Sequence, residues 1–206
     1  MSLLTKDFYT RPDVVVIARE LLGKLLVTQF DGKRTSGIIT ETEAYEGITD
    51  RASHAYSGRR SERTEIMYRV GGMAYVYLCY GVHSLFNIVT NIEDIPHAVL
   101  IRAINPVDGV KYMLERTGKS NISKDFSNGP GKVSKALGIH YSHTGFDLTK
   151  KFLRKNDPGI WLEDIGFSVN QEKIKITPRI GIDYAGADAS LPYRFIYDTN
   201  TQLPTP

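Results

Sequence analysis

The sequence predicts an α+β fold in which helices surround a mainly antiparallel β-sheet and one β-hairpin protrudes. Strand-like runs follow one another across short turn sequences, which is typical of antiparallel neighbours. Helical segments fall between groups of strands and not after every strand, unlike the pattern of a parallel α/β sheet. The chain of 206 residues shows no repeat and no linker, so we expect residues 1–206 to form a single domain.

The first expected element is a helix over residues 10–22. Its apolar side chains recur at helical spacing and would face a core. Pro12 suits the first turn of a helix, and Gly23 suits a helix end. The helix therefore has sequence signals at both ends.

Two strands are expected next, over residues 25–30 and 35–45. They flank Asp31-Gly32, which is a strong hairpin signal. Strict alternation along the second strand would place four side chains on one face: Ile39, Glu41, Glu43 and Tyr45. Carboxylates are rarely buried in a protein core, so this strand is a candidate for a functional site.

Residues 46–66 are rich in Gly, Ser, Asp and Arg and lack strand or helix periodicity. A loop of this length in a compact domain is usually functional or disordered. Its arginines suggest contacts with phosphates, although solvated charge beside Glu62 and Glu65 explains them equally well. These arginines are Arg51, Arg59, Arg60 and Arg63.

Residues 74–90 carry aromatic and β-branched side chains on both sides of Tyr80-Gly81, which predicts the protruding β-hairpin. Tyr75, Tyr77 and Cys79 would share one strand face. Buried phenols need hydrogen-bond partners, so tyrosines suit the wall of a site for a flat ligand better than a core. A tyrosine-rich sheet edge that packs on its neighbours is the alternative.

The rest of the chain predicts further strands and two helices. A strand over residues 97–104 leads through Asn105-Pro-Val-Asp-Gly into a helix that ends near Arg116. A second short helix follows Gly129-Pro-Gly-Lys, where Lys132 could bind a backbone phosphate beside a helix amino terminus. Alternating runs predict three last strands and then a loose tail; the strands are 161–167, 173–180 and 193–197.

Composition restricts the class of protein. The formal net charge of +3 fits an ordinary solvated surface as well as a polyanion partner. Cys79 is the only cysteine, which excludes an intramolecular disulfide and fits a reducing compartment. The start lacks a charged leader with a long apolar run, and no segment is apolar for long enough to span a bilayer. We therefore expect a cytoplasmic protein, with the nucleoid DNA if the source is prokaryotic, and no membrane partner.

Several motifs, in this order, resemble the alkyladenine (methylpurine) DNA glycosylase family along nearly the whole chain. They include Gly23-Lys-Leu-Leu-Val27, Ile39-Thr-Glu-Thr-Glu-Ala-Tyr45, Tyr75-Val-Tyr-Leu-Cys-Tyr-Gly81, Val99-Leu-Ile-Arg-Ala103, Pro178-Arg-Ile-Gly-Ile182 and Leu191-Pro-Tyr-Arg-Phe195. Any single motif could be chance, but the ordered set is specific. Two departures fall in expected DNA contacts: the stretch from Gly58 to Arg63 lacks the family's usual proline, and Val82 replaces its usual methionine.

The resemblance implies a monofunctional DNA glycosylase of base-excision repair that acts on damaged double-stranded DNA as a monomer, without cofactor or metal. Such an enzyme flips alkylated or deaminated purines, of the 3-methyladenine, hypoxanthine and ethenoadenine type, out of the duplex. An activated water then hydrolyses the N-glycosidic bond and leaves an abasic site.

The resemblance also implies roles for single residues. Glu43 is similar to the general base, with Arg102 and the backbone carbonyl of Ile180 helping to hold the water. Tyr80 is similar to the side chain that enters the duplex in place of the flipped nucleotide. The residues around the base would be Tyr45, His54, Tyr77 and the selectivity residue Asn87, and the DNA-backbone contacts would be Arg59, Arg63 and Lys132.

Elementary chemistry agrees with these roles. Aromatic rings can stack on an extruded purine and attract a cationic alkylated base, which is already a good leaving group. One carboxylate can then prepare the water, and we expect Glu41 to be a structural residue paired with a cation. The histidines lack ligand-like spacing and no Cys-x-x-Cys accompanies them, which disfavours a zinc deaminase and predicts no metal.

Two other classes remain as alternatives. A non-catalytic nucleic-acid-binding module would use the tyrosines and arginines but would leave Glu43 unexplained, since a carboxylate repels a polyanion. A nucleoside hydrolase or an ordinary glycosidase commonly uses two cooperating carboxylates or a metal, and neither arrangement is clear in the sequence.

Overall fold

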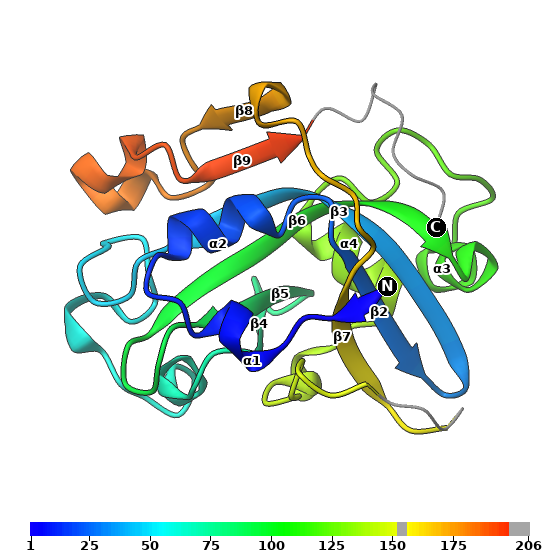
Figure 1. The fold of residues 1–206 in the computed structure, drawn as a ribbon, viewed down its shortest axis with the longest axis horizontal. Helices are drawn as coiled ribbons and strands as arrows, with labels where there is room; N and C mark the ends of the chain where they lie inside the picture. The colour runs from blue at the N-terminus through cyan, green and yellow to red at the C-terminus, as the bar shows by residue number, and fades with distance from the viewer. Residues whose placement is uncertain (152–155, 198–206) are drawn as a thin grey trace.

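The computed structural model describes residues 1–151 and 156–197, and their strands form one curved antiparallel sheet (Figure 1). The strand order is β1-β7-β2-β3-β6-β5-β4, and β9 pairs with both β3 and β8. The predicted α+β class with a mainly antiparallel sheet is confirmed, because every pairing between these strands is antiparallel. The strands are β1 (Ser2–Leu3), β2 (Leu25–Phe30), β3 (Lys33–Tyr45), β4 (Ala74–Cys79), β5 (His83–Thr90), β6 (His97–Asp108), β7 (Gly159–Asp164), β8 (Ile174–Thr177) and β9 (Arg194–Tyr197).

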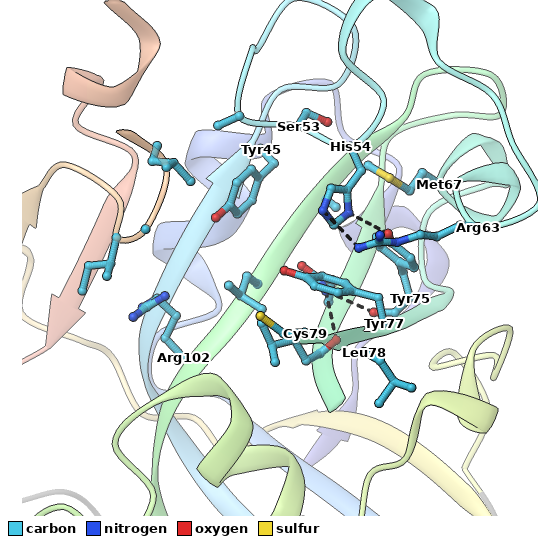
Figure 2. Close-up of a pocket in the computed structure, with 18 of the residues that line it drawn as sticks. Tyr45, Ser53, His54, Arg63, Met67, Tyr75, Tyr77, Leu78, Cys79 and Arg102 are labelled. Atoms are coloured by element: carbon cyan, nitrogen blue, oxygen red, sulfur yellow. Dashed lines mark hydrogen bonds between the residues drawn. The ribbon is translucent and has the colours of Figure 1, made fainter. Parts of the chain in front are cut away.

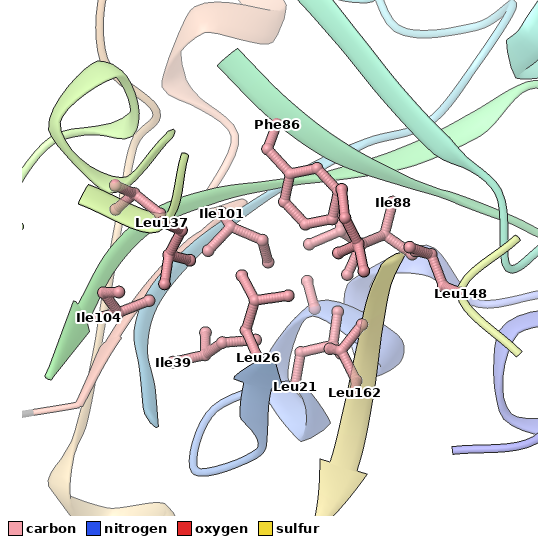
Figure 3. Close-up of a cluster of buried hydrophobic side chains, with 14 of the residues drawn as sticks. Leu21, Leu26, Ile39, Phe86, Ile88, Ile101, Ile104, Leu137, Leu148 and Leu162 are labelled. Atoms are coloured by element: carbon pink, nitrogen blue, oxygen red, sulfur yellow. The ribbon is translucent and has the colours of Figure 1, made fainter. Parts of the chain in front are cut away.

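The main core lies between one face of the sheet and the helices α2 and α4 (Figure 3). Side chains from the centre of the sheet, such as Leu26, Phe86 and Ile101, meet Leu21 and Leu137 there. The α-helices are α1 (Lys6–Tyr9), α2 (Val14–Glu20), α3 (Val110–Thr117) and α4 (Pro130–Leu137). Short 3-10 turns occur at Tyr56–Gly58, Glu65–Tyr68, Tyr141–His143, Gln171–Lys173 and Asp183–Ser190.

A smaller cluster covers the opposite face of β4, β5 and β6. Tyr75, Val89 and Ala98 belong to this cluster, whereas Val76, Ile88 and Val99 belong to the main core. Successive strand residues point to opposite faces, so the hairpin tyrosines turn away from the main core as predicted. The long connection between β3 and β4 lies over this second face and contributes Ala55, Met67 and Tyr68 to the cluster. The hairpin tyrosines and the β3–β4 connection therefore lie on the face opposite the helices.

A bulge in β3 changes the predicted face of one residue. The register with β6 shifts between Ile39 and Glu41, so Thr40 has no partner there. Ile39 lies in the main core together with Ala44, whereas Glu41 and Glu43 both contact Arg102. The prediction that Ile39 shares the face of the two glutamates was therefore wrong, because strict alternation does not hold across a bulge.

Both predicted hairpin turns form where expected. Asp31 and Gly32 have φ values of 52° and 70°, and Tyr80 and Gly81 have φ values of 51° and 70°. Two successive positive φ values give the turn whose twist matches antiparallel strands. The backbone of Tyr80 has a positive φ, which residues other than glycine rarely adopt. Its ring lies at the tip of the β4–β5 hairpin.

Other element boundaries differ from the predictions. Helix α2 begins at Val14 with Asp13 as its amino-terminal cap, so Pro12 precedes the helix instead of forming its first turn. Strand β6 continues through Pro106 to Asp108, where a helix start was expected. Strand β1 and the helix α1 had no sequence signal that we used. The predicted tail after Tyr197 lies outside the described residues.

Candidate active site

A cavity of about 440 Å³ opens on the face of the sheet opposite the helices (Figure 2). Eight of the predicted site residues line it: Arg63, Tyr80 and six others, which come from six different segments of the chain. These six residues are Tyr45 of β3, His54 of the β3–β4 connection, Tyr77 of β4, Asn87 of β5, Arg102 of β6 and Ile180 from the β8–β9 connection. The fold thus brings together residues that the sequence separates by as many as 135 positions.

Glu43 lies directly behind this cavity and has no exposed surface. Its Oε1 accepts a hydrogen bond of 2.9 Å from the Ile180 amide, and its Oε2 accepts one of 2.8 Å from the Tyr45 hydroxyl. The Arg102 guanidinium lies 3.3 Å from the same Oε2. A carboxylate has about four lone-pair sites, so these contacts leave about one site for a further donor such as water.

Burial raises the pKa of Glu43 above its ordinary value, whereas Arg102, the Ile180 amide and the Tyr45 hydroxyl oppose this shift. A carboxylate with a raised pKa accepts a proton more readily than an exposed glutamate does. The surroundings of Glu43 therefore suit a general base.

Glu41 has a different environment although it lies two residues away on the same strand. Its Oε1 accepts hydrogen bonds from the Nε atoms of Arg102 and Arg194, at 2.8 and 2.6 Å. Glu41 is 5% exposed and does not line the cavity of Figure 2. The structure confirms that Glu41 is paired with cations, and this pairing fixes the position of Arg102 beside Glu43.

Tyr77 and His54 form an aromatic wall of the cavity, and Tyr75 lies behind it. The ring centres of His54 and Tyr77 are 4.6 Å apart and nearly perpendicular, and those of Tyr75 and Tyr77 are 5.5 Å apart. His54 Nδ1 is 2.7 Å from the Tyr75 hydroxyl, and the Arg63 guanidinium is 3.3 Å from His54 Nε2. Since arginine can only donate, Nε2 is the acceptor and Nδ1 carries the proton that is donated to Tyr75.

Arg63 lines the cavity, although the sequence predicted a contact with the DNA backbone. Its guanidinium lies 4.9 Å from the centre of the Tyr77 ring. Burial, followed by Arg63 and Arg59, lowers the pKa of His54 to about 4. His54 is therefore neutral at physiological pH.

Tyr45 is held by an ion pair that the sequence did not reveal. The Arg179 guanidinium lies 4.7 Å from the centre of the Tyr45 ring and bonds to the Asp50 carboxylate and to the carbonyl of Ala44. Both charged side chains are almost completely buried. Asp50 also accepts hydrogen bonds from the amides of Glu46 and Ala52, so the pair joins β3, the β3–β4 connection and the segment of Ile180.

Asn87 is buried in the cavity wall and donates through Nδ2 to the carbonyls of Tyr75 and Leu85. Backbone contacts therefore hold its side chain in place within the wall. Ile180 contacts Glu43 through its amide, and its side chain is half exposed at the cavity edge.

Exposed aromatic and basic side chains surround the cavity mouth. Tyr80 is 94% exposed at the hairpin tip, and Tyr184, which sequence reasoning missed, is 70% exposed on the β8–β9 connection. Both line the cavity. Arg59 and Lys132 are exposed and lie outside the cavity lining. A large exposed ring without a packing role suggests contact with a partner.

Residues 1–151 and 156–197 lack two features that would indicate other kinds of protein. No group of three or more His, Cys, Asp or Glu side chains there is arranged to hold a metal ion. No helix in the same residues is long and apolar enough to cross a membrane.

Comparison with known proteins gives consistent matches along the chain. Residues 7–201 match the family model described as methylpurine-DNA glycosylase (MPG). A Chlamydia felis protein is 47% identical over 195 residues, which cover 94% of this chain and 95% of the relative. Proteins from Chlamydia pneumoniae and Bacillus thuringiensis are each 44% identical, over 94% and 90% of this chain and 94% and 91% of the relatives. All three relatives are provisionally named 3-methyladenine DNA glycosylases.

Proposed function

Since the chain belongs to the methylpurine-DNA glycosylase family, and is therefore a DNA glycosylase that hydrolyses N-glycosyl bonds in damaged DNA, we propose that it flips a damaged purine into the cavity described above. A cavity of about 440 Å³ between aromatic side chains is large enough for one purine base. The edge of a stacked base cannot reach Glu43, which lies behind the cavity wall. Extrusion of the damaged nucleotide from the duplex would bring its base into the cavity in front of Glu43.

Glu43 would act on one water held at its remaining lone-pair site, beside Arg102 and Ile180. As the bond between the purine and C1′ of the sugar breaks, the bond electrons leave with the base and the sugar becomes oxocarbenium-like. The water oxygen then bonds to C1′ while Glu43 takes up its proton, and a neutral purine, which leaves as an anion, takes up a proton from solvent. Arg102 and the carbonyl of Ile180 would orient the water, and the products are the free base and an abasic site.

The aromatic side chains would hold the base. We propose that it stacks between Tyr45 and the pair His54 and Tyr77, which Figure 2 shows on facing sides of the cavity. Asn87 lies in the wall where it can distinguish purines by their edges. Proposed substrates are 3-methyladenine, as the names of the relatives suggest, and the neutral purines hypoxanthine and ethenoadenine.

Tyr80 would occupy the space that the flipped nucleotide leaves in the duplex. Its exposed position at a rigid hairpin tip supports this role. Arg59 and Lys132, which are exposed and lie outside the cavity lining, would contact the DNA backbone.

The single observation that best supports this function is the buried carboxylate directly behind an aromatic cavity. A non-catalytic binding module has no use for a buried glutamate with a raised pKa, because desolvation of a carboxylate is costly. Water as nucleophile is favoured because no lysine among residues 1–151 and 156–197 lines the cavity. A Schiff-base mechanism would need such an amine.

Duplex oligonucleotides that carry a single hypoxanthine or ethenoadenine provide the test. We expect strand breaks only after hot alkali, because the direct product is an intact abasic strand. Borohydride should trap no covalent adduct between enzyme and DNA. Absence of alkali-sensitive sites on these and on 3-methyladenine-containing duplexes would refute the function, and a trapped adduct would refute the water mechanism.

A further inference from the structure

We propose that Arg63 is a specificity-determining residue that makes the base cavity favour neutral damaged purines over cationic ones. This inference rests on the proposed function, since it concerns the class of base that the same cavity accepts. It changes the role predicted for Arg63 from a contact with the DNA backbone to a charge beside the base.

Arg63 contacts the aromatic wall directly. Its guanidinium lies 3.3 Å from His54 Nε2 and 4.9 Å from the centre of the Tyr77 ring, and the residue lines the cavity. In Figure 2 it reaches this wall from the side away from Tyr45. A flipped base that stacks on Tyr77 would therefore share this ring with a cation that is already present.

The other charges near the cavity cancel one another. Glu41 and Glu43 face the two guanidiniums of Arg102 and Arg194. Asp50 and Arg179 form a buried pair, which neutralises the cation behind the Tyr45 ring.

Arg63, in contrast, forms no ion pair with any carboxylate among residues 1–151 and 156–197. It therefore places on the cavity lining a positive charge that no carboxylate of the described residues compensates. A second positive charge on the base would be repelled, and more strongly once DNA excludes water from the cavity mouth.

The Tyr77 ring should attract a cationic base less strongly than an isolated tyrosine ring would, because Arg63 lies beside it. An electron-rich ring face attracts a positive charge, and this attraction is the usual physical basis for selecting alkylated purines. The Arg63 guanidinium already lies near the Tyr77 ring, so the attraction for a cationic base is offset by repulsion between the two cations.

The lowered pKa of His54 indicates that the cavity disfavours positive charge. His54 is a cavity residue that could itself become a cation, and burial together with Arg63 and Arg59 lowers its pKa to about 4. The cavity therefore disfavours a proton on its own wall, and the same electrostatics act on a protonated or methylated base. A neutral purine avoids this cost and can still stack on Tyr77.

The test compares two lesions in wild type and three variants. Single-turnover excision is measured for hypoxanthine, which is neutral, and for N7-methylguanine, which is cationic, each in a duplex of the same sequence. For each protein the rate with N7-methylguanine is divided by the rate with hypoxanthine. This ratio removes any general loss caused by a displaced His54, since both bases use the same wall.

Arg63→Met should raise this ratio at least about fivefold, because it removes the charge and keeps an apolar contact with Tyr77. Arg63→Lys keeps the charge but loses the guanidinium fork, so both rates should fall while the ratio stays within about twofold of wild type. Arg59→Met removes a cation that lies on the same connection but outside the cavity lining, so it should lower both rates and raise the ratio less than Arg63→Met does.

An unchanged ratio in Arg63→Met would overturn the proposal. If that variant instead lost DNA affinity for both lesions in proportion, Arg63 would be the backbone contact that the sequence first suggested. These results differ from failure of the proposed function, in which wild-type protein would excise neither base.

Discussion

Glu41 and Glu43 show how two identical residues on one strand acquire different tasks. Glu41 accepts from two arginines and stays away from the cavity, whereas Glu43 has one ion-pair partner and lies against the cavity wall. Sequence alternation placed both carboxylates on one face but could not rank them, because their arginine partners lie far along the chain at positions 102 and 194.

Glu43→Gln should lower the single-turnover excision rate about 10²- to 10⁴-fold, because an amide cannot accept a proton from water. The fold should persist, since Arg102 keeps its bond to Glu41. Binding to lesion-containing DNA should remain. Wild-type-like excision by this variant would disprove the assignment.

Glu41→Gln is the matched control. It leaves Arg102 and Arg194 with one fewer buried anion, so it should cost about 3 kcal/mol in the free energy of unfolding. Urea denaturation measures this cost. Its excision rate, measured on folded protein, should fall much less than that of Glu43→Gln.

The raised pKa of Glu43 predicts opposite pH trends for rate and stability. Only the ionised carboxylate can act as a base, so excision should fall as the pH drops through a pKa that lies above the ordinary value of about 4.3. The folded protein binds this proton more tightly than the unfolded chain does. The stability that Glu43 contributes is therefore present at low pH and is lost as the pH rises through the raised pKa.

Rate and urea-unfolding profiles of wild type and Glu43→Gln between pH 4 and 8 test this linkage. Subtracting the variant's unfolding profile isolates the contribution of Glu43 from those of other carboxylates. A difference that grows more stabilising with rising pH would contradict the predicted sign.

At the scale of elements, the β4–β5 hairpin carries one tyrosine in the cavity wall and another at its exposed tip. Tyr77 lies within β4 and packs against His54 and Tyr75, whereas Tyr80 is 94% exposed in the turn. Replacing Tyr80 therefore removes no packing from the folded protein. Its loss should be felt only in the complex with DNA.

Tyr80→Ala should lower the population of flipped nucleotide, because stacking of a base on an aromatic ring is worth about 1 to 3 kcal/mol. The loss of single-turnover rate should be largest for hypoxanthine in a stable pair and smallest opposite an abasic site, where extrusion costs less. Tyr77→Ala damages the cavity wall, so its defect should persist in every context.

Fluorescence of ethenoadenine reports flipping in the same duplexes. If Tyr80→Ala flipped the reporter as fully as wild type and lost no rate in any pairing context, Tyr80 would not be the wedge.

The Asp50–Arg179 pair connects three elements around Glu43, and no local pattern predicted it. The two residues are 129 positions apart, and Arg179 lies next to Ile180, whose amide bonds to Glu43. Asp50→Asn should cost about 3 to 5 kcal/mol in unfolding free energy, because it leaves a buried guanidinium without its charge partner. The displaced Ile180 segment should also reduce kcat more than it changes the affinity for DNA.

Arg60→Met is the control for this prediction. Arg60 pairs with Glu65 and Asp94 on the surface, where solvent screens the charges, so its loss should destabilise the fold much less than Asp50→Asn does. A double-mutant cycle of Asp50→Asn and Arg179→Met should give a coupling energy well above that of the surface pair. If Asp50→Asn destabilised the protein no more than Arg60→Met does, and also left kcat unchanged, then the Asp50–Arg179 pair would not position the Ile180 segment.

Features of the fold that depend on adjacent residues were predicted correctly, whereas features that depend on pairing between distant strands were not. The turns at Asp31 and at Tyr80 were predictable because two adjacent residues determine them. The bulge at Thr40 and the extension of β6 through Pro106 were not, because they depend on how β3 and β6 pair across the sheet. Local proline chemistry favoured a helix start, but tertiary pairing overrode it.

Across the whole molecule, the site combines residues that were found by family resemblance with residues that only the fold reveals. Glu43, Tyr45, His54 and Tyr77 belong to motifs and lie together as expected. Arg179 lies in the motif Pro178-Arg-Ile-Gly-Ile182, but the motif does not reveal its pairing with Asp50, and Tyr184 lies outside the motifs. Their position depends on the β8–β9 connection, which follows β3 by more than a hundred residues.

The distribution of charge over the whole surface gives a last prediction, about DNA affinity. The net charge of +3 is small, so binding must depend on a few well-placed cations. Arg59 and Lys132 are exposed, and no carboxylate of the described residues pairs with either. Arg60, on the same connection as Arg59, is already neutralised by Glu65 and Asp94.

The logarithm of the affinity for a hypoxanthine duplex should fall linearly with the logarithm of the salt concentration, since bound phosphates release counterions. Arg59→Gln and Lys132→Gln should each reduce this slope by about 1, whereas Arg60→Gln should leave it unchanged. Measurements in a Glu43→Gln background prevent excision during the titration. If all three variants changed the slope equally, the cations would act through net charge alone, and the proposed positions of the DNA backbone beside Arg59 and Lys132 would be wrong.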